Sequence, residues 1–216
     1  MTVLVLGSGG REHALALACH RDPDVVAVHV APGNPGTASF ATNHPLDPCD
    51  CDAVVSLARD LEADLVVVGP EAPLVAGVAD ALRDAGIDCF GPSAEAARLE
   101  GSKAFAKEVM VAAGVPTAAS RSCDDVDSVS AALDEFGAPY VVKDDGLAGG
   151  KGVVVANDRT EALAHAERCL GSGHRVVIEE YLDGPEVSLF AICDGTHVLP
   201  MQPAQDFKRV GDGGVG

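Results

Sequence analysis

Short runs of aliphatic residues alternate with amphipathic stretches through residues 1–100. Four apolar runs predict β-strands, at residues 3–6, 25–30, 65–68 and 87–90. Three stretches with a helical spacing of apolar positions predict α-helices, at residues 11–20, 51–61 and 74–85. Strands that are apolar throughout and separated by helices are typical of a parallel sheet covered on both faces. Residues 1–100 are therefore expected to form a parallel α/β domain.

The pattern changes after residue 91, where strands and helices no longer alternate regularly. Two short helices are expected on either side of residues 101–103, and residues 114–116 are typical of a connector. Helices are then expected at 126–136 and 161–170, and strands at 140–143, 153–156, 176–180, 187–193 and 197–201. This order predicts an α+β region with hairpin-like strand pairs rather than a continuation of the parallel sheet.

Glycine- or proline-rich loops follow the first three predicted strands, at residues 7–10, 31–36 and 69–71. Ligands of open parallel sheets bind beyond the carboxyl ends of the strands, so these loops are candidates for a binding site. The first loop is only part of a dinucleotide fingerprint, because Glu12 stands where the third glycine would be. This departure disfavours a hydride-transfer enzyme, although the loop could still bind a phosphate at its helix N-terminus.

A second candidate site surrounds Lys143, which a predicted strand carries into a segment with Gly149, Gly150, Lys151 and Gly152. Glycine backbone N–H groups can approach phosphate oxygens closely, and two lysines could neutralise a triphosphate. The segment is not a Walker A loop, which requires a glycine at the place of Asp145 and Ser or Thr at that of Gly152. The alternative is a glycine-rich hairpin with solvated lysines.

Acidic residues end the apolar run at 176–178, where Glu179 and Glu180 follow it. Backbone groups of an exposed strand edge there could form hydrogen bonds with an adenine, and the Glu186 carboxylate could accept hydrogen bonds from ribose hydroxyls. The alternative is a strand with a solvated acidic end. Near residue 208 the pair Lys208 and Arg209 stands out in so acidic a chain and favours an anion site.

Charge and composition narrow the class of protein. The 216 residues include 33 acidic and 15 basic side chains, a net charge of −18, which argues against a nucleic-acid partner. The longest apolar runs are too short to span a bilayer, and no positive leader precedes the first one, so a cytoplasmic protein without membrane association is expected. The seven cysteines are scattered and odd in number, which fits a reducing compartment.

Seven segments, in order, resemble the phosphoribosylamine–glycine ligase (glycinamide ribonucleotide synthetase) family of the ATP-grasp superfamily: residues 5–14, 31–37, 68–74, 99–105, 143–153, 178–180 and 205–211. The resemblance covers the N-terminal half of the family. It implies an N-terminal parallel α/β (pre-ATP-grasp) domain at 1–100. A partial α+β ATP-grasp domain is implied at 101–216, with a small lobe at about 116–190.

The same resemblance implies ATP-dependent ligation of glycine to 5-phosphoribosylamine in de novo purine biosynthesis. Glycinamide ribonucleotide, ADP and phosphate form through glycyl phosphate. The residues implied to bind ATP are Lys103, Lys143, Gly149, Gly150, Lys151, Gly152, Glu179, Glu180, Tyr181, Leu182 and Glu186. Those implied to bind the phosphoribosylamine end are Gly9, Gly10, Arg11, Glu12, Gly33, Asn34, Pro70 and Glu71. Those implied to lie near the reacting groups are Lys143, Lys151, Asp206, Lys208 and Arg209.

The chain departs from the family in length, since family members are about twice as long. The family's Mg²⁺ (or Mn²⁺) ligands are expected beyond Gly216, so no metal ligand is assigned within the chain, and the chain alone is expected to be inactive. An exposed apolar face and self-association are also expected. Two other interpretations remain open: another ATP-grasp carboxylate–amine ligase, and a nucleotide-binding module without activity.

Overall fold

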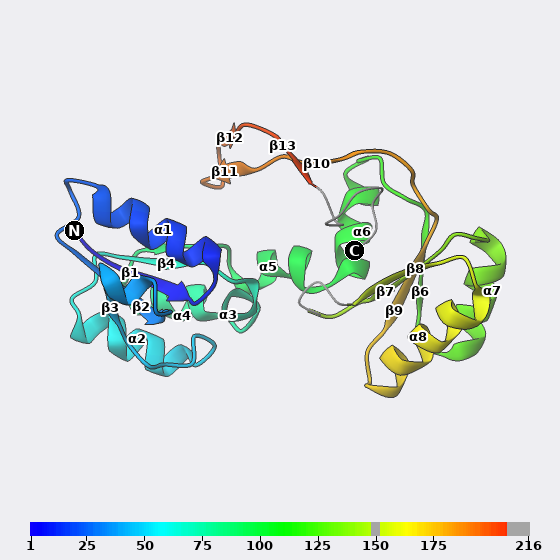
Figure 1. Ribbon diagram of the computed structural model, residues 1–216, viewed down its shortest axis with the longest axis horizontal. Helices are drawn as coiled ribbons and strands as arrows, with labels where there is room; N and C mark the ends of the chain where they lie inside the picture. Colours follow the sequence, from blue (N-terminus) through cyan, green and yellow to red (C-terminus); the bar gives the residue numbers. More distant parts are fainter. Residues whose placement is uncertain (148–151, 207–216) are drawn as a thin grey trace. The chain divides into compact units, whose positions relative to one another are not determined.

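The computed structural model describes residues 1–147 and 152–206 (Figure 1). These fall into two compact units, Met1–Glu180 and Tyr181–Gly216. The first unit contains two sheets and the helices that cover them, and the second contains short hairpin strands.

A five-stranded parallel sheet forms the N-terminal part of the first unit, in the order β3-β2-β1-β4-β5. Its strands are β1 (Thr2–Gly7), β2 (Ala27–Pro32), β3 (Thr42–Asn43), β4 (Leu65–Val68) and β5 (Cys89–Phe90). This arrangement confirms the predicted parallel α/β fold. Strand β3 was not expected, because its two polar residues give no hydrophobic pattern.

The helices of this part are α1 (Gly10–Arg21), α2 (Cys51–Asp60), α3 (Glu71–Val75) and α4 (Val78–Asp84), with a short 3₁₀ turn, η1 (Thr37–Ser39). The single helix expected at residues 74–85 is therefore wrong. Gly77 has a φ of +93°, a left-handed conformation that interrupts the helix between α3 and α4.

Side chains alternate between the two faces of this sheet and build two cores. Leu4 and Leu6 of β1 pack with Val54 of α2 and Leu82 of α4. Val5 of β1, with its neighbours of the same parity, packs with α1 on the opposite face. Figure 1 shows α1 on one side of the sheet and α2 and α4 on the other, as expected for strands that are apolar throughout.

A four-stranded antiparallel sheet forms the second part of the first unit, in the order β6-β9-β7-β8. Its strands are β6 (Ser120–Cys123), β7 (Tyr140–Asp144), β8 (Val153–Ala156) and β9 (Val176–Glu179). The remaining helices are α5 (Ala94–Gly101), α6 (Lys103–Ala112), α7 (Val126–Phe136) and α8 (Arg159–Gly171). Helices α7 and α8 share one core with the sheet, which confirms the predicted α+β lobe.

Up to residue 206, where the description ends, the second unit has four short strands in two antiparallel pairs: β10 (Glu186–Ser188) with β13 (Ala204–Asp206), and β11 (Ala191–Cys193) with β12 (Val198–Pro200). The single strand expected at residues 187–193 is wrong, because Leu189 and Phe190 separate β10 from β11. Several large apolar side chains are exposed here, including Leu189, Phe190, Leu199 and Met201.

None of the helices among the described residues is both long and apolar enough to cross a membrane. Each of the seven cysteines is a free thiol.

Candidate functional site

The loops that follow β1, β2 and β4 meet at the carboxyl edge of the parallel sheet. The backbone N–H of Gly33 donates to the carbonyl of Gly7 over 3.1 Å. The side-chain amide of Asn34 donates to the carbonyl of Ser8 over 3.0 Å. The three loops that the sequence singles out are therefore neighbours, and the first two are tied together by hydrogen bonds.

Glu12 lies buried, 4% exposed, at the start of α1. Its carboxylate accepts hydrogen bonds from the N–H of Gly9 over 2.8 Å and from Nε of Arg11 over 2.7 Å. A side chain at Gly7 or Gly69 would collide with Glu12. Gly69 is thus explained by the close approach of the Glu12 carboxylate, and Gly7 also by its φ of +126°. The same carboxylate accepts a hydrogen bond from one N–H of the loop expected to face a phosphate.

Arg11 is the exposed cation of this edge. Its guanidinium is held between Glu12 and Glu71, whose carboxylate lies 3.6 Å from Nη2. The hydrogen bond to Glu12 raises the pKa of Arg11 above its usual value, against a smaller opposing effect of burial. Arg11 is therefore a permanently charged group, oriented on the surface where the first and third loops meet.

Asn34, Pro70 and Glu71 have local structural roles as well. The Asn34 carboxamide oxygen accepts from the N–H groups of Gly36 and Thr37, over 2.8 and 3.0 Å, and so shapes the turn after β2. Pro70 is the N-cap of α3, and Glu71 is its first residue. Gly10, the first residue of α1, has open space around the position of a side chain.

Two lysines face one carboxylate in the second part of the unit. Nζ of Lys143, on β7, lies 2.8 Å from Oε2 of Glu179, on β9. Nζ of Lys107, on α6, lies 3.4 Å from Oε1 of the same carboxylate. The Glu179 side chain is 6% exposed, that of Lys107 12% and that of Lys143 27%. Lys143 is thus the most accessible cation of this group.

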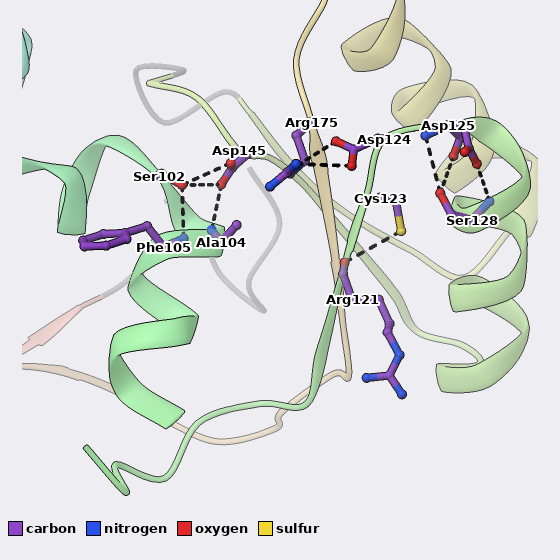
Figure 2. Close-up of polar contacts among 10 residues, drawn as sticks. All are labelled: Ser102, Ala104, Phe105, Arg121, Cys123, Asp124, Asp125, Ser128, Asp145 and Arg175. Atoms are coloured by element: carbon purple, nitrogen blue, oxygen red, sulfur yellow. Dashed lines mark hydrogen bonds and ion pairs between the residues drawn. The ribbon is translucent and has the colours of Figure 1, made fainter. Parts of the chain in front are cut away.

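The start of the glycine-rich segment is fastened to α6, as Figure 2 shows. The Asp145 carboxylate accepts from the N–H of Ala104 over 2.7 Å and from the hydroxyl of Ser102 over 3.1 Å. Nζ of Lys103 donates to the carbonyl of Gly146 over 3.1 Å. The structure therefore brings Lys103 to the same segment that Lys143 precedes.

Asp144, at the end of β7, is paired with His174, whose Nδ1 lies 2.9 Å from its carboxylate. Burial alone raises the pKa of Asp144, but the contacts with His174 and the N–H of Gly146 outweigh it, so that the pKa lies below its ordinary value. The N–H of Asp144 also donates to the carbonyl of Gly152 over 2.7 Å. Both ends of the glycine-rich segment are thus held.

The other residues assigned to the nucleotide occupy different environments. Glu180 accepts from the N–H of Ala119 over 3.0 Å, which links β9 to the chain before β6. Tyr181 and Leu182 are exposed. Glu186 lies in β10 and pairs by backbone with Asp206 of β13. Five assigned residues lie outside the described part of the chain: Gly149, Gly150, Lys151, Lys208 and Arg209.

Sequence reasoning missed Lys107 and Asp145 as members of this site. Lys107 follows Lys103 by one helical turn, so the spacing of four residues was a usable signal that both lie on one face of α6. In the sequence, Asp145 indicates only a departure from a Walker A loop. Its contact with Ala104 joins residues 41 positions apart, and no local pattern encodes it.

Comparison with known proteins gives matches along the whole chain. Residues 1–100 match the family model for the phosphoribosylglycinamide synthetase N domain, and residues 101–216 match that for its ATP-grasp (A) domain. The phosphoribosylamine–glycine ligase of Streptomyces coelicolor is 65% identical over 216 residues, which are 100% of this chain and 51% of the relative. The chain thus spans about half the length of the curated relatives it matches.

Solved structures agree with this. The crystal structure of phosphoribosylamine–glycine ligase from Thermotoga maritima superposes with a TM-score of 0.82 at 32% identity, covering 100% of this chain and 53% of that one. An N5-carboxyaminoimidazole synthetase from Staphylococcus aureus, complexed with ADP, superposes with a TM-score of 0.75 at 19% identity, over 94% of this chain and 54% of that one, and shows the shared fold alone. With both family models matched in sequence order, the chain belongs to the phosphoribosylglycinamide synthetase family.

Proposed function

We propose that the chain provides the nucleotide site and part of the substrate site of a phosphoribosylamine–glycine ligase. The reaction is ATP-dependent ligation of glycine to 5-phosphoribosylamine in purine biosynthesis, giving glycinamide ribonucleotide, ADP and phosphate through glycyl phosphate. The relative that is 65% identical carries this name, which supports the proposal. The observation that carries the ATP assignment is the placement of Lys103 and Lys143 at the start of one glycine-rich segment.

Charge explains what these residues would do for ATP. Phosphoryl transfer requires little covalent chemistry from the protein and depends on positioning and on screening the phosphate oxygens. Lys143 is the accessible cation of its cluster, and Lys103 contacts a backbone carbonyl that a phosphate oxygen could replace. Lys151 would add a third ammonium from the same segment. Glu180, Tyr181, Leu182 and Glu186 are proposed to line the adenosine pocket.

Arg11 is the residue proposed to bind the phosphate of 5-phosphoribosylamine, with the N–H groups of the first turn of α1. A helix N-terminus favours an anion, and Arg11 is a charged, exposed group beside it. Asn34, Gly33, Pro70 and Glu71 would form the rim of this site. The roles of Asp206, Lys208 and Arg209 near the reacting groups rest on the family resemblance.

The described residues do not fit the metal that this family is expected to use. Among residues 1–147 and 152–206 there is no group of three His, Cys, Asp or Glu side chains that could hold an ion. We propose that the ligands for Mg²⁺ or Mn²⁺ are supplied by the half of the family sequence that this chain does not span. The chain by itself would then bind ATP without turning it over.

The domain division at residues 100 and 101, with a small lobe at about 116–190, is part of the proposal. It is supported by the change of family model at that point and by the break between α5 and α6 at Ser102. A cytoplasmic location is proposed as well, and the seven free thiols support it.

The test is ADP release by the purified chain with ATP, Mg²⁺, glycine and 5-phosphoribosylamine, each omitted in turn, together with ATP binding by calorimetry. We expect binding without turnover, and loss of binding in Lys143→Met but not in Arg21→Met, which removes an exposed charge. Turnover that requires all four components would contradict the proposed need for further metal ligands. A chain that binds no ATP would overturn the nucleotide assignment.

A further inference from the structure

Lys107 makes contacts in three directions from the face of α6. Its ammonium donates to the hydroxyl of Thr117 over 2.7 Å and to the carbonyl of Ala118 over 2.9 Å. It also lies 3.4 Å from Oε1 of Glu179. An ammonium has three N–H donors, and here three acceptors surround it. Lys107 is therefore saturated by the protein and has no N–H left for a nucleotide.

Lys143 has the opposite character although it shares the same carboxylate. Within the described part of the chain, Oε2 of Glu179 is the one acceptor that its ammonium contacts. Its side chain is also about twice as exposed as that of Lys107, at 27% against 12%. Lys143 can thus bind a phosphate oxygen while it keeps its contact with Glu179.

The charge balance of this group depends on Lys107. Lys143 and Glu179 alone would form a neutral pair, and a neutral pair gives a phosphate little electrostatic attraction. With Lys107 the group carries two ammoniums and one carboxylate, a net charge of +1. Because Glu179 is 6% exposed, water screens this charge less than it would at the surface.

We infer that Lys107 is a positioning residue of the nucleotide site. It binds the Glu179 carboxylate on the oxygen that Lys143 does not contact, and its positive charge offsets the negative charge of the carboxylate. The positive charge of Lys143 is then available to the nucleotide phosphates. This inference rests on the proposed binding of ATP. It assigns a role in binding to a residue that does not touch the nucleotide. It also distinguishes the phosphates from the adenosine part of the ligand, because a change in local charge acts on the phosphates alone.

The test compares the affinities of ATP and adenosine by calorimetry, using the full chain. Lys107→Met should weaken ATP binding on the order of fivefold, as expected for one charge removed a few ångströms behind the site, and leave adenosine within about twofold. Lys107→Arg, which keeps the positive charge, should have an ATP-to-adenosine affinity ratio close to that of wild type. Arg21→Met, which removes one exposed positive charge elsewhere, is the matched control for the net charge of the chain.

A second pair of variants keeps the test valid if Lys107→Met does not fold, because that change leaves a buried carboxylate with one partner. Glu179→Gln keeps the shape of the side chain and should raise the ATP-to-adenosine affinity ratio. Adding Lys107→Met to Glu179→Gln should return the ratio to the wild-type value, since the group again carries a charge of +1. Circular dichroism checks that each variant is folded.

The outcomes separate this inference from the function on which it rests. If wild type binds ATP but both ligands weaken equally in Lys107→Met, Lys107 has only a structural role and the inference is overturned. An unchanged ratio in both the Lys107→Met and Glu179→Gln variants also overturns it while the nucleotide site stands. If wild type binds neither ATP nor adenosine, the proposed function itself fails, and the role of Lys107 fails with it.

Discussion

The carboxylate of Asp145 accepts a 2.7 Å hydrogen bond from the backbone N–H of Ala104, so the end of β7 is fastened to the first turn of α6 (Figure 2). The hydroxyl of Ser102, which caps α6, reaches the same carboxylate over 3.1 Å. A negative group at this position also interacts favourably with the positive end of the helix dipole. One side chain thus connects the helix that carries Lys103 to the segment that would surround the phosphates.

Asp145→Ala is expected to lower the free energy of unfolding by about 1–2 kcal/mol, because it removes a charged acceptor from a helix N-terminus. It should also weaken ATP binding, since the helix that carries Lys103 loses the Asp145 contacts that fasten it to the glycine-rich segment. Urea unfolding and calorimetry measure the two effects. The control is Asp124→Ala, whose exposed partner Arg175 appears in the same figure and which should change neither quantity. Equal behaviour of the two variants would contradict the assigned role of Asp145.

Gly69→Ala is expected to destabilise the chain by about 1–3 kcal/mol, because the new methyl group would overlap the side chain of Glu12. Shortening that side chain should relieve the overlap, so the double variant Gly69→Ala with Glu12→Ala should lose less stability than the two single variants added together. Gly171→Ala is the matched control, because the space around that helical glycine is open. Strict additivity in urea unfolding would mean that Glu12 does not determine the need for glycine.

The pair formed by Asp144 and His174 is expected to make stability depend on pH in the acid range. The pKa of Asp144 is lowered in the folded chain, so its carboxylate stabilises the fold above the ordinary pKa of about 4. That contribution is lost as the pH falls through the lower, folded-state value. The difference in unfolding free energy between wild type and Asp144→Asn should therefore be full at pH 6 and shrink below about pH 4. A difference that stays constant down to pH 3 would contradict the direction of this pKa shift.

The exposed apolar residues of the second unit are expected to cause self-association. Leu189 is 64% exposed, Phe190 59% and Leu199 64%, which leaves much apolar area in contact with water. Replacing Phe190 and Leu199 by serine should reduce the binding of a dye that fluoresces on apolar surfaces. It should also reduce the rise of the apparent mass with protein concentration in analytical ultracentrifugation. Val26→Ser, which removes an 81% exposed side chain of the first unit, is the control and should change neither. A wild-type chain that stays monomeric would remove the basis for this expectation.

Hydrophobic patterning predicted most of the regular structure but failed where the pattern was weak. Helix α7 and strand β8 have the predicted bounds, because apolar residues recur at helical spacing in α7 and form an unbroken run in β8. Strand β6 was missed because Ser120–Cys123 is mostly polar and gains its place by pairing with β9. The division between α3 and α4 depends on the backbone conformation of Gly77. This conformation is not evident from the sequence, because the residues on either side of Gly77 favour a helix.

The sequence places Lys143 and Glu179 in one candidate site, but the contact between them could not be predicted. Lys143 and Glu179 are separated by 36 positions, and no pattern in the sequence around either residue predicts their contact. The register of β7 and β9 brings them together: Val141 pairs with Glu179 and Lys143 with Val177, so Lys143 and Glu179 are diagonal neighbours on one face. Register is a property of the folded sheet, so the contact between Lys143 and Glu179 could not be predicted from either segment alone.

The close packing of Glu12 against Gly69 makes the residues that evolution can accept at these two positions depend on each other. Gly7 and Gly69 have no room for a side chain while Glu12 is present, and Gly9 gives its N–H to the same carboxylate. A lineage that replaces Glu12 by a smaller residue would free Gly69 to accept alanine, whereas the reverse order would pass through an overpacked protein. Gly7 stays a glycine in either case, because its φ of +126° strains any other residue. Substitutions at residues 12 and 69 should therefore be accepted in a fixed order, with the change at residue 12 coming first.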